Sequence, residues 1–106
     1  MSLGYAREKF GLALDAMATS PQSIQQRIAD AYASHIIHVI ADDLPEYLRP
    51  QLRDIKERLT HTEAIHNEGS LVATVSNMPT EEAVEIARMI FHLNVDICSL
   101  EDSARG

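Results

Sequence analysis

Two histidines and an aspartate in the first half of the chain are the side chains best suited to chemistry. His35, His38 and Asp42 follow one another at spacings of three and four residues. An α-helix turns by about 100° per residue, so these spacings place the three side chains within roughly 60° of one another. Two imidazoles and a carboxylate suit zinc or a non-haem iron. The pattern therefore marks a candidate metal site, and His92 is the natural source of a further ligand from another helix or subunit.

The same three residues also have a structural interpretation. Their helical face continues the apolar positions Ile24, Ile28 and Ala31. The histidines would then end a buried face, with ring nitrogens bonded to a carbonyl group or to water. We favour this interpretation because no second cluster of ligands lies in register, and we predict no cofactor.

The remaining candidates have simple explanations. His61 and His66 lie five residues apart across a predicted helix end and share no helical face, so capping by a cation at the helix C-terminus is favoured. His92 and Asp96 are four residues apart and suit a surface ion pair. Cys98 lies on an apolar side of the last helix, where a cysteine behaves as a small hydrophobic residue.

No catalytic constellation emerges from the other polar residues. The serines lack the glycine elbow of a hydrolase, and the four glycines are too scattered to form a phosphate-binding loop. Glu81, Glu82 and Glu85 match a carboxylate metal site only loosely, and acidic residues in the first turn of a helix are favoured by its dipole. We therefore favour a protein that is not an enzyme.

Length and charge narrow the classes further. The chain has 106 residues, of which 45% are apolar, and we expect one domain over 4–102. A formal charge of -7 disfavours binding to nucleic acid or to an anionic membrane surface. A single cysteine, with neither a signal-peptide pattern nor an apolar run of about 18 residues, predicts a soluble cytoplasmic protein.

Apolar periodicity predicts helices that would position these residues. The first covers 5–18, and the second covers 21–41, with Ser20 as its cap and Pro21 in its first turn. A break at 61–70 precedes a short helix over 70–78, which Ser70 would cap. The last helix covers 80–100, with an apolar stripe formed by Ala83, Ile86, Ala87, Ile90, Leu93 and Ile97.

The third main helix, over 49–61, has the clearest pattern. Its apolar positions are Leu48, Leu52, Ile55 and Leu59, and residues 45–49 are expected to form a separate turn before it. Its outward face is charged, with Asp54 placed to pair with Arg58. The basic residues of this helix, Arg49, Arg53 and Lys56, are interrupted by Asp54 and Glu57, which favours a solvated face.

These elements predict an all-α fold, a small helical bundle of four main helices plus one short helix. The second and last helices carry more apolar residues than one bundle can cover, so we expect a symmetric homodimer. The favoured function is a non-enzymatic protein-interaction or regulatory module with a possible protein partner. The alternative is a metal-binding protein or metalloenzyme that uses His35, His38 and Asp42.

Overall fold

The computed structural model describes residues 2–61 and 69–105, with side chains for all of these except residues 70 and 101–105. Its helices are α1 (Leu3–Thr19), α2 (Ile24–Ser34), α3 (Arg49–Thr60), α4 (Ser70–Ser76) and α5 (Thr80–Arg105). No strand occurs within these two ranges. The predicted all-α bundle, with four main helices and one short helix, is confirmed.

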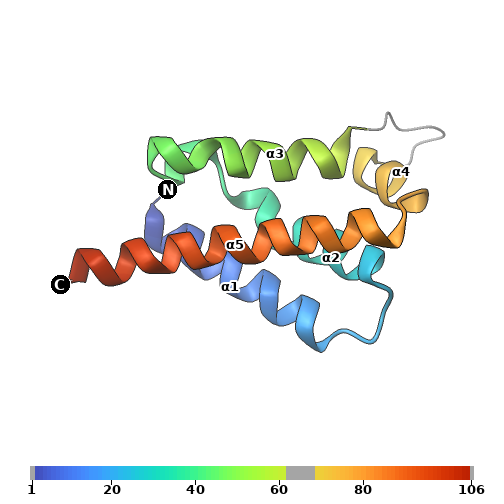
Figure 1. Cartoon of the computed structure of the whole chain (residues 1–106), viewed down its shortest axis with the longest axis horizontal. Helices are drawn as coiled ribbons and strands as arrows, with labels where there is room; N and C mark the ends of the chain where they lie inside the picture. The colour runs from blue at the N-terminus through green and yellow to red at the C-terminus, as the bar shows by residue number, and fades with distance from the viewer. Residues whose placement is uncertain (1, 62–68, 106) are drawn as a thin grey trace.

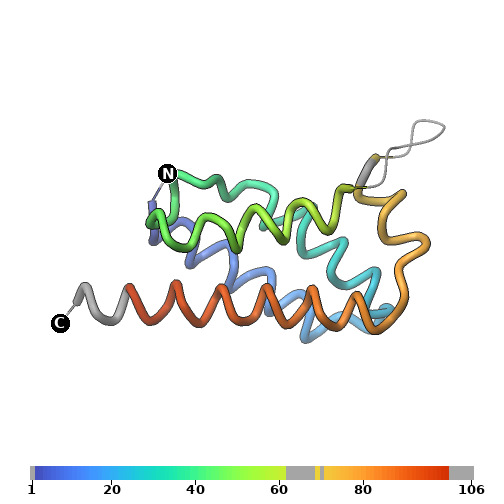
Figure 2. The backbone as a smooth tube through the Cα atoms, turned by 45° about the horizontal axis from the view of Figure 1, so that its top comes forward, coloured from blue at the N-terminus to red at the C-terminus, as the bar shows by residue number. Residues whose placement is uncertain are grey.

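The longest helix, α5, runs the length of the bundle (Figure 1). In both overall views α3 lies alongside α5 with the opposite chain direction, whereas α1 crosses α5 at an angle (Figures 1 and 2). One hydrophobic core joins all these helices, and its largest fully buried side chains include Phe10, Ile28, Ile55 and Ile90. The C-terminal end of α5 projects past the ends of α1 and α3 (Figure 1).

The helix starts differ from the sequence expectations in their caps. Ser2, which lies before the expected start of the domain at residue 4, accepts a hydrogen bond from the Tyr5 N–H at 3.1 Å and caps α1. The α2 helix begins at Ile24 instead of Pro21, because Ser23 is its cap and accepts from the Gln26 N–H at 3.1 Å. A serine three residues after the expected one therefore sets this boundary.

The predicted helix over 21–41 is wrong in its second half. The α2 helix ends at Ser34, and three short 3₁₀ turns follow: η1 (Ile36–His38), η2 (Ala41–Asp43) and η3 (Glu46–Leu48). Isoleucine and valine, which make up four of the five residues at 36–40, are stiff at χ1 and are weaker helix formers than alanine or leucine. The irregular path buries Ile36 and Val39, whereas Ile37 and Ile40 stay 46% and 49% exposed.

Two side chains hold these turns in place. The Asp43 carboxylate accepts a hydrogen bond from the Ile40 N–H at 2.9 Å. The Arg49 guanidinium donates from Nε to the carbonyl oxygens of Ala41 and Leu44, at 3.0 and 3.1 Å. The chain therefore replaces α-helical backbone bonds with the backbone bonds of the 3₁₀ turns and with these bonds to side chains.

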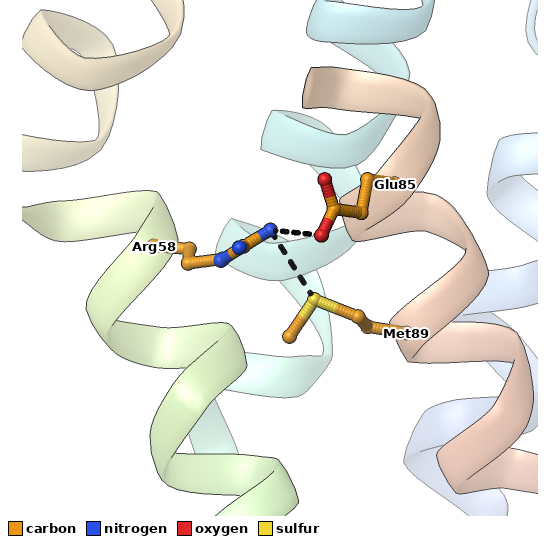
Figure 3. A network of polar contacts seen from close by, with 3 residues as sticks. All are labelled: Arg58, Glu85 and Met89. Atoms are coloured by element: carbon orange, nitrogen blue, oxygen red, sulfur yellow. Dashed lines mark hydrogen bonds and ion pairs between the residues drawn. The ribbon is translucent and has the colours of Figure 1, made fainter. Parts of the chain in front are cut away.

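The predicted stripe of α3 is confirmed, since Leu48, Leu52, Ile55 and Leu59 are all buried. The expected pairing of Arg58 with Asp54 is wrong. Arg58 instead reaches across to α5, where its Nη1 lies 3.0 Å from Glu85 Oε1 and 3.7 Å from Met89 Sδ (Figure 3). A contact between helices thus replaces one within a helix.

The last two helices differ from their expected bounds, and α4 ends at Ser76 instead of residue 78. Gly69 stands at the cap position of α4, where Ser70 was expected, and the buried Met78 follows the helix. Gln25 Nε2 donates to the Met78 carbonyl at 3.0 Å, which ties α2 to the junction of α4 and α5. The α5 helix continues to Arg105, past the expected end at residue 100.

Candidate functional site

The three candidate metal ligands do not share a helix. His35 is the C-cap of α2, His38 belongs to η1, and Asp42 belongs to η2. The prediction that these three side chains share one helical face is therefore wrong. Among the described residues, no group of three or more His, Cys, Asp or Glu side chains is placed to hold a metal ion. Metal binding itself stays a prediction to be tested.

The other histidines take structural positions. His61 is the C-cap of α3, and its Nδ1 lies 3.1 Å from the Arg58 carbonyl oxygen, which agrees with the expected capping role. His66 lies outside the described residues. His92 packs edge-on against the Phe91 ring, with 5.7 Å between the ring centroids. Asp96 accepts from Gln51 Nε2 at 3.3 Å, so the expected pair of His92 and Asp96 is replaced by a contact from α5 to α3.

A line of exposed apolar side chains on α5 is the most distinctive surface feature. Val84, Phe91 and Val95 are 40%, 51% and 42% exposed. Their spacings of seven and four residues keep them within roughly 40° around the helix. We call these three residues the α5 stripe. Its residues belong to the apolar surplus that the sequence indicated for the last helix.

A groove adjoins the α5 stripe. It has a volume of about 330 Å³ and is lined by Arg7, Glu8, Gly11, Leu12, Asn94 and Cys98. Leu12, on α1, is itself an exposed apolar residue. Cys98 is half-buried, where burial was expected, and its Sγ lies 3.9 Å from Asn94 Oδ1. The groove therefore lies between α5 and α1 and has a mixed lining, in which Leu12 is the large apolar residue.

Comparison with known protein families, curated protein sequences and solved structures found no match to this chain. Functional inference therefore depends on the residues themselves. None of the described helices is both long enough and apolar enough to span a membrane.

Proposed function

We propose that this protein is a non-enzymatic interaction module that acts as a homodimer, joined through the α5 stripe. The observation that carries the proposal is the alignment of Val84, Phe91 and Val95, each at least 40% exposed, on one side of a long helix. Large contiguous apolar patches on soluble proteins mark interaction sites. A second copy of the chain supplies a surface of the same kind.

The stripe is complementary to itself. Phe91 lies seven residues after Val84 and seven before Cys98. A twofold axis at Phe91 would stack the two Phe91 side chains and place Val84 of each copy beside Cys98 of the other. Such an arrangement uses the same patch on both subunits, as twofold dimers do. It also sets the two α5 dipoles antiparallel, which is the favourable orientation.

The dimer interface must include α1. Stable complexes bury about 800 Å² on each partner, which exceeds what three side chains provide. The groove beside the stripe offers the additional contact area, and Leu12 is the exposed apolar side chain that α1 contributes there. We therefore expect the two copies to cross so that α5 of each one contacts both α5 and α1 of the other.

Charge opposes this association. Each chain carries a formal charge of -7, so two copies repel one another. Salt screens such repulsion over distances of roughly 10 Å at 0.1 M ionic strength. We expect the dimer to become tighter as salt concentration rises, which is also the direction that apolar contacts give.

Sedimentation of the purified chain tests the proposal. We expect a dimer at micromolar concentration and a dissociation constant at least about tenfold weaker in Phe91→Ser, because an aromatic anchor is lost from the centre of the interface. Tyr47→Ser is the matched control, since Tyr47 is an aromatic residue that is 66% exposed outside the stripe. A wild-type chain that sediments as an 11.8 kDa monomer throughout the micromolar range would contradict the proposal.

The orientation of the two copies can be tested separately. Under mild oxidation, Val84→Cys should form a disulfide from residue 84 of one copy to Cys98 of the other, because the proposed axis brings these positions together. The wild-type chain has Cys98 alone and should form little crosslinked dimer. A rapid disulfide between two Cys98 side chains would instead indicate parallel α5 helices.

A further inference from the structure

A second hollow lies away from the α5 stripe, between α3 and the turns that follow α2. Its volume is about 260 Å³, and its lining consists of Ile40, Ala41, Arg49, Leu52, Arg53 and Lys56. Three of these residues are apolar and three carry a positive charge. We call this hollow the α3 pocket.

The three basic residues of the α3 pocket form one row. Arg49, Arg53 and Lys56 are spaced by four and three residues, which places them side by side along α3. Asp54, which was expected to interrupt them, instead lines a different hollow with Gln51, Met89 and His92, on the side of α3 that faces α5. Glu57 makes no ion pair with Arg53 in the part of the chain that the structure describes. The positive charge is therefore concentrated beside the pocket.

The cations differ in how firmly they are held. Arg49 is fixed by its Nε bonds to the Ala41 and Leu44 carbonyl oxygens, so it forms a rigid wall. Arg53 is exposed and makes no hydrogen bond or ion pair with any other described side chain or backbone group. Arg53 can therefore turn toward a ligand without breaking a contact.

Lys56 has a more buried position. Burial lowers the pKa of its ammonium group, and the negative charge of Asp43 opposes that change. Although burial would raise the pKa of Asp43, hydrogen bonds that include the one from the Ile40 N–H lower it, so Asp43 is ionised at neutral pH. Asp43 is not among the lining residues, so the charged side chains that line the pocket are all positive.

We propose that the α3 pocket binds a small amphiphilic anion, namely a monocarboxylate with a short apolar chain. The side chains of Ile40, Ala41 and Leu52 would take the chain, and Arg53 and Lys56 would take the carboxylate. A guanidinium fork matches a carboxylate in geometry and charge. The volume of about 260 Å³ is below the range of roughly 300–1,000 Å³ that drug-sized ligands occupy, so the ligand must be small.

The overall charge of the chain makes this proposal specific. At a net charge of -7, the protein as a whole repels anions. Saturable binding of a carboxylate therefore requires a local site of positive charge. The apolar lining adds a requirement for a hydrocarbon chain, so neither a bare carboxylate nor a neutral alcohol should suffice.

Titration of the full chain with sodium octanoate below its micellar concentration tests the proposal, with backbone amide NMR shifts as the measurement. We expect saturable shifts at Ile40, Ala41 and Arg53. Acetate lacks the apolar chain, octanol lacks the charge and octylammonium has the opposite charge, so each should bind at least about tenfold more weakly. Equal binding of octanol, equal binding of acetate, or shifts confined to the α5 stripe would overturn the proposal.

Substitutions then test whether Arg53 binds the carboxylate. Arg53→Gln should weaken octanoate binding about tenfold, because it removes a charge-assisted hydrogen bond while its exposed position spares the fold. Arg88→Gln removes an exposed arginine from α5 and should leave the affinity unchanged. An affinity that is insensitive to Arg53→Gln, or that falls equally in Arg88→Gln, would contradict the assignment.

Discussion

Residues 36–40 and α5 both contain more apolar side chains than one helical face uses, and the chain accommodates them in different ways. In the first region the helix stops at Ser34, and the turns that follow bury Ile36 and Val39. In the second region the helix continues, so the surplus residues stay on one exposed line. The regular helix therefore leaves its surplus apolar residues on one exposed line, whereas the irregular turns bury part of theirs and leave Ile37 and Ile40 about half exposed.

The difference follows from local chemistry. β-Branched residues at 36–40 lose side-chain freedom in a helix, and Asp43 and Arg49 offer side-chain bonds that support turns instead. The α5 helix also contains valine and isoleucine, but alanine, arginine, methionine and glutamate, which favour a helix, are interspersed among them. Regular structure persists where propensity and packing agree.

The largest expected effect is on the free energy of unfolding, and it distinguishes the adjacent residues Ile36 and Ile37, which differ in burial. Ile36→Ala should lower the free energy of unfolding by about 2–5 kcal/mol, because it removes buried methyl groups and leaves a cavity. Ile37→Ala should cost well under half as much, since this side chain is 46% exposed. Denaturation in urea measures both values.

Alanine substitutions at Ile90 and Phe91 of α5 provide a second pair of adjacent buried and exposed residues for comparison. Ile90→Ala should resemble Ile36→Ala because both side chains are fully buried. Phe91→Ala should have a small effect on the unfolding of the monomer and a large effect on the dimer. Equal losses for Ile36→Ala and Ile37→Ala would show that the turns do not separate these two side chains.

Sequence periodicity was sufficient for the regular parts of the fold. Leu52, Ile55 and Leu59 recur at helical spacing, and all three are buried, so the predicted apolar face of α3 is correct. The end of α2 could not be predicted, because no glycine or proline separates His35 from Ala41. The side-chain bonds of Asp43 and Arg49 lie at residues 40–44, so they stabilise the turns that follow α2 and do not mark its end at Ser34.

Of the two candidate surfaces, the α5 stripe was indicated by the sequence and the α3 pocket was not. The sequence indicated an apolar surplus on the last helix, and Val84, Phe91 and Val95 are residues of that helix that stay exposed. The α3 pocket was not predicted because Ile40 and Ala41 reach α3 only through the irregular turns. Its one signal in the sequence was the spacing of Arg49, Arg53 and Lys56, and Asp54 obscured it until the helix faces were known.

An intermediate effect is expected at the carboxylate that holds the turns. Asp43→Ala should cost about 1–3 kcal/mol of unfolding free energy, because the part-buried Ile40 N–H loses its acceptor and a buried side chain is removed. Asp43→Asn keeps an acceptor oxygen and should cost less at neutral pH. Thermal or urea denaturation of both variants measures the difference.

The pH dependence of this effect has a defined sign. The pKa of Asp43 is lowered from its ordinary value of 3.8, so the folded state favours the carboxylate. Its contribution to stability is present above the pKa of the unfolded chain and is lost as pH falls through the lower, folded pKa. The stability difference between wild type and Asp43→Asn should therefore shrink below about pH 4. A difference that grows in acid would contradict the ionised state of Asp43.

The smallest expected effect is the response to zinc, and it tests the same irregular region. His35, His38 and Asp42 lie on three separate elements, so a metal ion would have to draw these turns together and displace the bonds of Asp43 and Arg49. We expect calorimetry on the chain without a histidine tag to show no stoichiometric zinc uptake at neutral pH. Site binding, by contrast, would give a one-to-one isotherm that weakens below about pH 6, where protons compete for imidazole, and that is lost in His38→Ala. If the isotherm is retained in His92→Ala, His92 is not the further ligand that the sequence indicated. The two variants together decide whether residues 35–42 bind zinc or have only a structural role.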